Sequence, residues 1–185
     1  MSRYEKYSQN PRRLQGFDYR SEGLYFITIC TKDRLPYFGK VESGEMILSV
    51  EGQVVQDCWT RISDHFPKVF LGEFVVMPNH MHGLIGIERS EPSLHHVDAC
   101  IDATEAAADK NRLMAHRSPK AGSVSRIIGS FKSASTNKIR ALGTTDFNWQ
   151  PRFHDRITRN QQELEKIENY IITNPIKWTD DRFHI

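Results

Sequence analysis

The chain has 185 residues and a net charge of +2, with 38% apolar and 26% charged residues, as expected for one globular domain. Its three cysteines are far apart and include no C-x-x-C pair, which excludes a disulfide framework and fits a reducing cytoplasm. It has no apolar run long enough for a transmembrane helix and no apolar core of a secretory signal near its start, so we expect no membrane partner.

The first half of the chain predicts strands and one helix. Residues 1–22 are polar and basic and are interpreted as an extended arm, whereas residues 24–31 are β-branched and aromatic and predict a strand. Residues 32–44 are interpreted as a turn-rich connection and residues 45–48 as a short edge strand. The apolar spacing over residues 50–66 predicts a helix that Pro67 ends.

Two apolar runs, residues 69–77 and 81–87, flank Pro78 and Asn79, which are favoured in turns, so they predict an antiparallel hairpin. Residues 88–122 are polar and are interpreted as a long variable connection.

The last third of the chain predicts two helices around a short strand. An apolar stripe over residues 123–142 predicts a helix that ends at Gly143, and residues 147–158 predict a strand or an irregular segment. Asn160, followed by Glu163, resembles a capping box that begins a helix over residues 161–173. The resulting order of elements predicts an α+β fold, with helices packed on an antiparallel sheet.

Positive charge is concentrated in one window. Between Lys110 and Thr145 there are eight Lys and Arg residues and no acidic residue. Such a local excess favours a polyanionic partner, and phosphate groups are the natural candidate. Solvated surface charge is the alternative interpretation for any single member of this window. Aromatic residues interleaved with arginines follow it, namely Phe147, Trp149 and Phe153, which could stack on nucleic-acid bases or lie in the core.

The histidines of the run VVMPNHMHGLIGI are the strongest chemical signal in the chain. His80 and His82 are two residues apart at the start of a predicted strand, so both side chains point to one face of the sheet. Two adjacent imidazoles suit a shared metal ion, because neutral histidine is the commonest nitrogen ligand. Hydrogen-bonded histidines without a metal are the alternative.

Tyr170 and Asn174 lie four residues apart near the end of the last predicted helix, so they share one face if the helix continues that far. A tyrosine hydroxyl can act as a covalent nucleophile on phosphorus, and a divalent cation held by His80, His82 and Asn174 could polarise the phosphate. Taken singly, Tyr170 is better explained as a core-edge tyrosine, and Asn174 as a helix end before Pro175.

These motifs resemble a known family. The run MPNHMHGLI is similar to the histidine–hydrophobic–histidine motif of single-tyrosine HUH transposases, and ENYIITNPIKW resembles their catalytic-tyrosine helix. The segments RIIGSFKSAST and WQPRFHDRITRN resemble the REP-associated tyrosine transposases of the IS200-like group. The resemblance covers residues 24–178, apart from residues 88–122.

The resemblance implies a single transposase domain over residues 1–185, with a ferredoxin-like, RRM-like sheet, the histidine motif on a central strand and the catalytic tyrosine on the helix of residues 160–174. It further implies a nucleoid-associated enzyme that nicks and rejoins single-stranded DNA, often beside a hairpin, with Mg²⁺ or Mn²⁺. Tyr170 would form a 5′-phosphotyrosine intermediate, with His80, His82 and Asn174 as metal ligands. The protein would be a monomer or a homodimer.

The charge pattern adds candidate DNA contacts, which are Lys and Arg residues of the N-terminal arm, of the basic window and of the segment after it. They are Arg12, Arg13, Lys120, Arg126, Lys132, Lys138, Arg152 and Arg156. Two other functions stay open. One is a domesticated protein that binds hairpin DNA without cutting it, and the other is an HUH replication initiator or relaxase, although 185 residues leave little room for the helicase domain that such proteins often carry.

Overall fold

The computed structural model describes residues 23–88, 122–158 and 160–184. Its centre is a four-stranded antiparallel sheet in the order β4-β5-β1-β6. The strands of this sheet are β1 (Gly23–Cys30), β4 (Val69–Met77), β5 (His80–Ile87) and β6 (His154–Thr158). The sheet therefore has β5 and β1 as its two inner strands. The expected α+β fold with an antiparallel sheet is confirmed.

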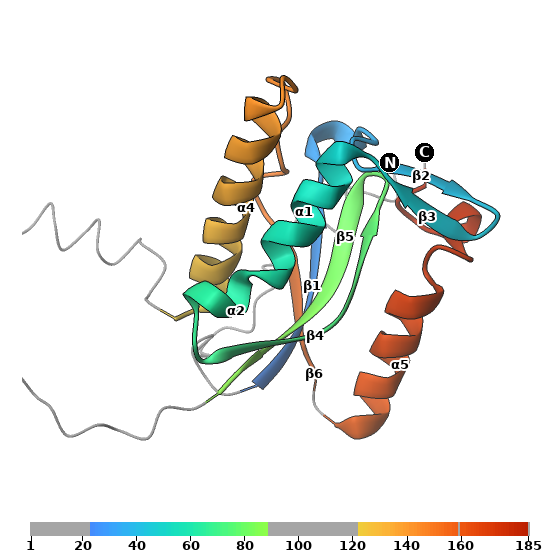
Figure 1. Cartoon of the computed structure of the whole chain (residues 1–185). Coiled ribbons are helices and arrows are strands. Elements are labelled where there is room, and N and C mark those ends of the chain that lie inside the picture. The colour runs from blue at the N-terminus through green and yellow to red at the C-terminus, as the bar shows by residue number, and fades with distance from the viewer. Residues whose placement is uncertain (1–22, 89–121, 159, 185) are drawn as a thin grey trace, which may run out of the picture.

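Helices cover both faces of this sheet (Figure 1). The helices on one face are α1 (Val50–Thr60), α2 (Ile62–His65) and α4 (Val124–Ala141), and α5 (Gln161–Thr173) lies on the other. Because both faces are covered, all eight residues of β5 are buried. Side chains that alternate along β5 therefore enter two different environments, one under α1 and α4 and one under α5.

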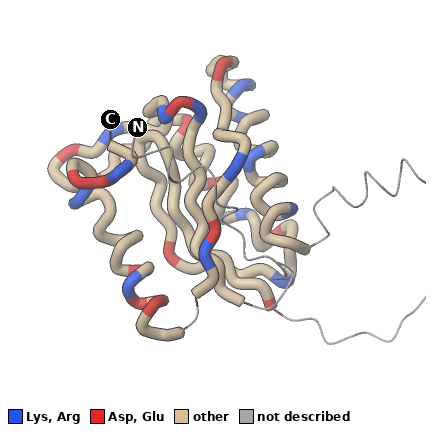
Figure 2. The backbone as a smooth tube through the Cα atoms, turned by 180° about the vertical axis from the view of Figure 1, so that it is seen from behind, with Lys and Arg blue, Asp and Glu red and all other residues tan. Residues whose placement is uncertain are grey.

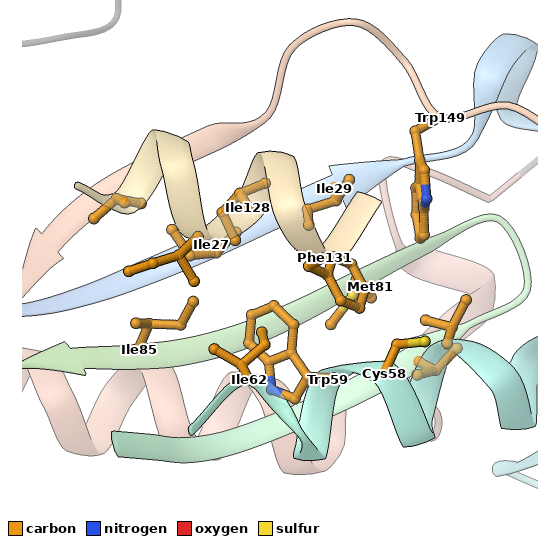
Figure 3. Packing of buried hydrophobic residues seen from close by; sticks show 14 of the residues in the cluster. Ile27, Ile29, Cys58, Trp59, Ile62, Met81, Ile85, Ile128, Phe131 and Trp149 are labelled. Atoms are coloured by element: carbon orange, nitrogen blue, oxygen red, sulfur yellow. The ribbon is translucent and has the colours of Figure 1, made fainter. Parts of the chain in front are cut away.

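The larger core lies between the sheet and the helices α1 and α4 (Figure 3). Ile27 and Ile29 of β1 and Met81 and Ile85 of β5 meet aromatic side chains there, with Trp59 of α1 among them. A smaller cluster on the other face joins Leu84 to Ile167 and Ile171 of α5. The smaller cluster anchors the helix that carries Tyr170.

Local sequence signals account for most element boundaries. Ser49, Ser123 and Asn160 precede α1, α4 and α5 and accept hydrogen bonds from backbone N–H groups of the first turn. The hairpin of β4 and β5 turns at Pro78 and Asn79, as predicted. These caps and this turn fix where the last helix and the histidine strand begin.

Two sequence interpretations need correction. Residues 32–44 are not only a connection, because they contain the 3₁₀ turn η2 (Lys32–Arg34) and the strand β2 (Gly39–Glu42). β2 pairs with β3 (Glu45–Leu48) in a separate two-stranded sheet, with Ser43 and Gly44 in left-handed turn conformations. The predicted helix over 50–66 is interrupted at Arg61, where α1 ends and α2 begins.

None of the helices in the described ranges is both long and apolar enough to cross a bilayer.

Gly83 shows how tightly β5 packs against α1. A Cβ atom at this position would lie 2.3 Å from Cζ2 of the buried Trp59. We therefore expect Gly83→Ala to destabilise the protein by about 1–3 kcal/mol, because the indole is held by neighbouring core side chains. Urea unfolding would measure the difference. Gly129→Ala on α4, where nothing lies within 4 Å of the new methyl group, is the matched control and should be neutral or slightly stabilising.

Candidate active site

His80 and His82 begin β5 on the face covered by α5. Their cross-strand neighbours on β1 are Cys30 and Thr28, respectively. Both imidazoles are fully buried. The strand period thus brings the two rings together, as the sequence predicted, with Nε2 of His80 3.1 Å from Nε2 of His82.

Hydrogen bonds orient both rings. The side-chain nitrogen of Asn79 donates to the carbonyl oxygen of Phe183 at 2.8 Å, so its Oδ1 is the acceptor for Nδ1–H of His80 at 2.9 Å. Nε2 of His80 is then left with a free lone pair. Nδ1 of His82 lies 2.8 Å from Oγ1 of the buried Thr28. Partners of this kind at the distal nitrogen are typical of histidines that bind a metal through the other nitrogen.

Both histidines are held in the neutral form. Burial lowers the pKa of His80 to about 4. Burial also lowers the pKa of His82 well below its ordinary value, and the adjacent His80 lowers it further. At neutral pH both rings therefore present lone pairs rather than positive charges, which is the state that a metal ion requires.

The lowered pKa of His80 predicts that acid destabilises the protein. An unfolded histidine binds its proton near pH 6.5, whereas folded His80 does so near pH 4, so unfolding takes up a proton in between. Stability should be complete above pH 6.5 and should fall by on the order of 3 kcal/mol as the pH drops to about 4. Urea unfolding with EDTA across this range measures the effect. A His80→Gln variant should have a flatter profile, and an equally steep one would contradict this assignment.

Tyr170 reaches the histidines from α5. Its hydroxyl group lies 3.1 Å from Nε2 of His82 and 3.3 Å from Oδ2 of Asp181. Its ring meets the ring of His82 at 5.1 Å between centroids and the ring of Phe26 at 6.1 Å. The side chain is 37% exposed, so a substrate can reach it. Burial and the charge of Asp181 raise the pKa of Tyr170 to about 12, so the hydroxyl is protonated at neutral pH.

Asn174 lies directly after α5 and contacts Asp181, which lies beside the histidines. It is only 2% exposed, and its amide nitrogen donates to Oδ2 of Asp181 at 2.9 Å. Its Oδ1 is buried and has no hydrogen-bond partner within the described part of the chain. A buried carbonyl oxygen without a partner is costly, and this one is free to bind a cation.

The residues present fit a divalent metal ion. The ligand atoms of His80, His82 and Asp181 all lie within 4.8 Å of one another, and Asn174, whose amide nitrogen donates to Asp181, carries an unpaired oxygen. Mg²⁺ and Mn²⁺ prefer oxygen ligands, whereas imidazole alone favours Zn²⁺ and related ions. The carboxylate oxygen of Asp181 makes the donor set a mixed one, which is compatible with Mn²⁺ or Mg²⁺.

Sequence reasoning missed Asp181 and the rest of the C-terminal segment, residues 178–184. The ring of Phe183 packs on the ring of His80 at 4.5 Å, and Trp178 lies 5.9 Å from the same ring. The backbone N–H of Phe183 donates to Oδ1 of Asp181 at 2.7 Å, which fixes the carboxylate. The acidic and aromatic residues shortly after Asn174 were the available signal for this segment. The segment is short and mixed in composition, however, so no periodic pattern indicated where Asp181 would lie.

The predicted DNA contacts do not all lie near this site. Arg12, Arg13 and Lys120 lie outside the described residues. Arg126, Lys132 and Lys138 are on α4, which is on the opposite face of the sheet from α5 and Tyr170 (Figure 1). The part of the basic window that lies on α4 is therefore not next to the tyrosine, a separation that linear sequence could not reveal.

Lys132 has a structural role in addition to its charge. Its ammonium group donates to the carbonyl oxygens of Gln150 and Pro151, and burial lowers its pKa.

The predicted stacking residues Phe147 and Trp149 are buried in the core, so they are not available to DNA bases. By contrast, Arg152 and Arg156 are exposed, and Arg156 forms an ion pair with Glu163 of α5.

Comparison with known proteins identifies a relative in sequence. No protein-family model matches this chain. An uncharacterized protein of Haemophilus influenzae is 33% identical over 176 residues, which cover 94% of this chain and 91% of that protein. The two proteins belong to one family.

The fold has a solved counterpart. A structure of a REP-associated tyrosine transposase bound to a REP hairpin aligns with a TM-score of 0.55 at 18% identity. The alignment covers 90% of this chain and 74% of that one. This family member thus resembles a REP-associated tyrosine transposase in fold, which agrees with the resemblance found in its motifs.

Proposed function

We propose that this protein is a metal-dependent transposase that nicks and rejoins single-stranded DNA at hairpins through a 5′-phosphotyrosine intermediate. The observation that carries the proposal is the position of the Tyr170 hydroxyl, 3.1 Å from Nε2 of His82 and 3.3 Å from Oδ2 of Asp181. A nucleophile next to a cluster of metal-ligand atoms suits phosphoryl transfer. The fold of a transposase that was solved with a REP hairpin supports the choice of DNA.

In the forward reaction, the phenolic oxygen of Tyr170 attacks phosphorus and the bond from phosphorus to the 3′ oxygen breaks. The 3′ oxygen takes up a proton and leaves as a hydroxyl group, while the 5′ phosphate stays on Tyr170. Attack by a 3′ hydroxyl on this link restores a phosphodiester and frees Tyr170. The two steps exchange one ester for another, so no nucleotide cofactor is required.

The protein must also remove the proton of Tyr170, since burial and Asp181 raise the pKa of the hydroxyl to about 12. The carboxylate of Asp181, 3.3 Å away, is placed to accept that proton. His80, His82 and Asn174, with Asp181 beside them, would hold a Mg²⁺ or Mn²⁺ ion. A bound cation supplies Lewis-acid polarisation of the phosphate.

A denaturing-gel assay tests the proposal. The protein is incubated with end-labelled single-stranded hairpin DNA in Mg²⁺, Mn²⁺ or EDTA. A metal-dependent, protease-sensitive covalent adduct is the expected result. Retained DNA binding without any adduct on a broad pool of hairpins would contradict the proposal and would favour a domesticated hairpin-binding protein.

A further inference from the structure

A basic groove lies beside the candidate active site. It is lined by η2 and the turn before β6, through Lys32, Asp33, Arg34, Gln150, Pro151 and Arg152. Three cationic side chains face one acidic side chain there, so the groove has a net positive charge. Figure 2 shows both blue and red segments at the end of the molecule that carries the C-terminus.

The groove is joined rigidly to the candidate active site. The backbone N–H group of Thr31, directly before η2, donates to the carbonyl oxygen of Asn79 at 2.9 Å. Asn79 in turn orients His80. Any ligand bound at η2 would therefore be held in a fixed position relative to the histidines.

A second connection runs through side chains. The guanidinium group of Arg34 lies 5.3 Å from the centre of the Phe183 ring, and that ring packs on His80 at 4.5 Å. The guanidinium group of Arg182 covers the same ring at 4.6 Å. Positive charge thus continues from the groove to the edge of the histidine pair.

The backbone of η2 is also unusual. Asp33 and Arg34 both have positive φ values, 55° and 58°, which are uncommon for residues other than glycine. The turn is stabilised by a hydrogen bond from the hydroxyl of Thr31 to the carbonyl oxygen of Leu35 at 2.8 Å. Consecutive left-handed residues that the surrounding structure enforces are found preferentially at binding and active sites.

Two of the three cationic side chains of the groove, Lys32 and Arg152, have no ion-pair partner among the described residues. Both side chains are exposed. This contrasts with Arg156, which pairs with Glu163, and with Lys132, which is bonded to backbone carbonyls. Cations without protein partners beside a phosphoryl-transfer site suit additional phosphates.

We infer that this groove binds the backbone phosphates of single-stranded DNA that flank the scissile phosphodiester. The identity of the ligand rests on the proposed function, since a DNA strand that is cut by Tyr170 must continue past one side of the candidate active site. Lys32 and Arg152 contact phosphates directly. Arg34 lies between the groove and the candidate active site, where the strand would cross.

The test is a salt titration of DNA binding. Lys32→Gln/Arg152→Gln is compared with wild type by fluorescence anisotropy on an unstructured single-stranded oligonucleotide, at several salt concentrations without divalent metal. Loss of two phosphate contacts should weaken binding several-fold and reduce the slope of log K against log salt by about 1.4. The control, Lys40→Gln/Arg61→Gln, removes the same charge at two exposed positions outside the groove and should not change the slope.

A second measurement uses covalent adduct formation. The groove variant should be impaired with a long oligonucleotide and equal to wild type with one that spans little more than the scissile phosphodiester. An unchanged salt slope in the groove variant, or an equal decrease in both variants, overturns the inference. Because the binding measurement needs no cleavage, a decrease confined to the groove variant supports the groove even if wild type forms no adduct, and then only the proposed function fails.

Discussion

Replacing Tyr170 with Phe is expected to abolish the covalent DNA adduct. The substitution removes one oxygen atom, the predicted nucleophile, and retains the ring that packs against His82 and Phe26. Adduct should fall below detection on denaturing gels, while DNA affinity should change by no more than about twofold, because no phosphate contact is lost. Because Tyr170 is 37% exposed, loss of its hydroxyl should alter stability by no more than about 1 kcal/mol.

Tyr37→Phe is the matched control for this result. Tyr37 also donates a hydrogen bond to a carboxylate, Asp146 at 2.9 Å, but it lies away from the histidines. The Tyr37 variant should form the adduct at the wild-type rate. Adduct that persists in Tyr170→Phe would show that another residue attacks the DNA.

Loss of either histidine is expected to remove metal-dependent cleavage. His82→Ala deletes a buried imidazole whose Nε2 faces both His80 and Tyr170 and which we propose as a metal ligand. Because even the loss of residues that only support metal ligands costs 10–100-fold, we expect at least about a 100-fold decrease in adduct formation, and His80→Ala should behave alike. Mn²⁺ binding, measured by titration calorimetry or electron paramagnetic resonance, should weaken in parallel.

His65→Ala on α2 controls for histidine replacement in general, since that residue is exposed and lies on the other face of the sheet. Circular dichroism spectra and unfolding curves should show that each variant is folded before its activity is compared. Cleavage that continues equally in wild type with EDTA would remove the metal from the mechanism and leave the histidines with a different role.

The fold was largely predictable because its signals are local. The cap at Asn160, the turn at Pro78 and Asn79, and the apolar stripes of α4 and α5 each specify one element. The strand β2 was missed because Pro36, Gly39 and Gly44 mark turns on both sides of a very short segment. Such short strands are specified by their partner rather than by their own composition.

The candidate site was only partly predictable. His80 and His82 are neighbours through strand geometry alone, and Tyr170 and Asn174 through helix geometry, so their pairing needed no tertiary information. Asp181 could not be found in this way, because its position depends on the C-terminal segment, where Phe183 packs on His80 and bonds to Asn79. Likewise, no feature of the linear sequence links Lys32 to Arg152. The pairing of β1 with β6 brings these two residues together.

The position of the connection between β5 and α4 has a practical consequence. β5 starts with His80 and leaves the sheet at Ile87, and α4 begins at Val124, so both attachment points lie at the end of the sheet opposite the histidine pair (Figure 1). His80 and Ile87 are seven steps apart along the extended strand, a span of about 23 Å. A fluorescent reporter or affinity module inserted directly after Glu88 would therefore be attached at the end of the sheet remote from Tyr170. This makes the end of β5 a favourable attachment point for tagged versions that keep the candidate active site accessible.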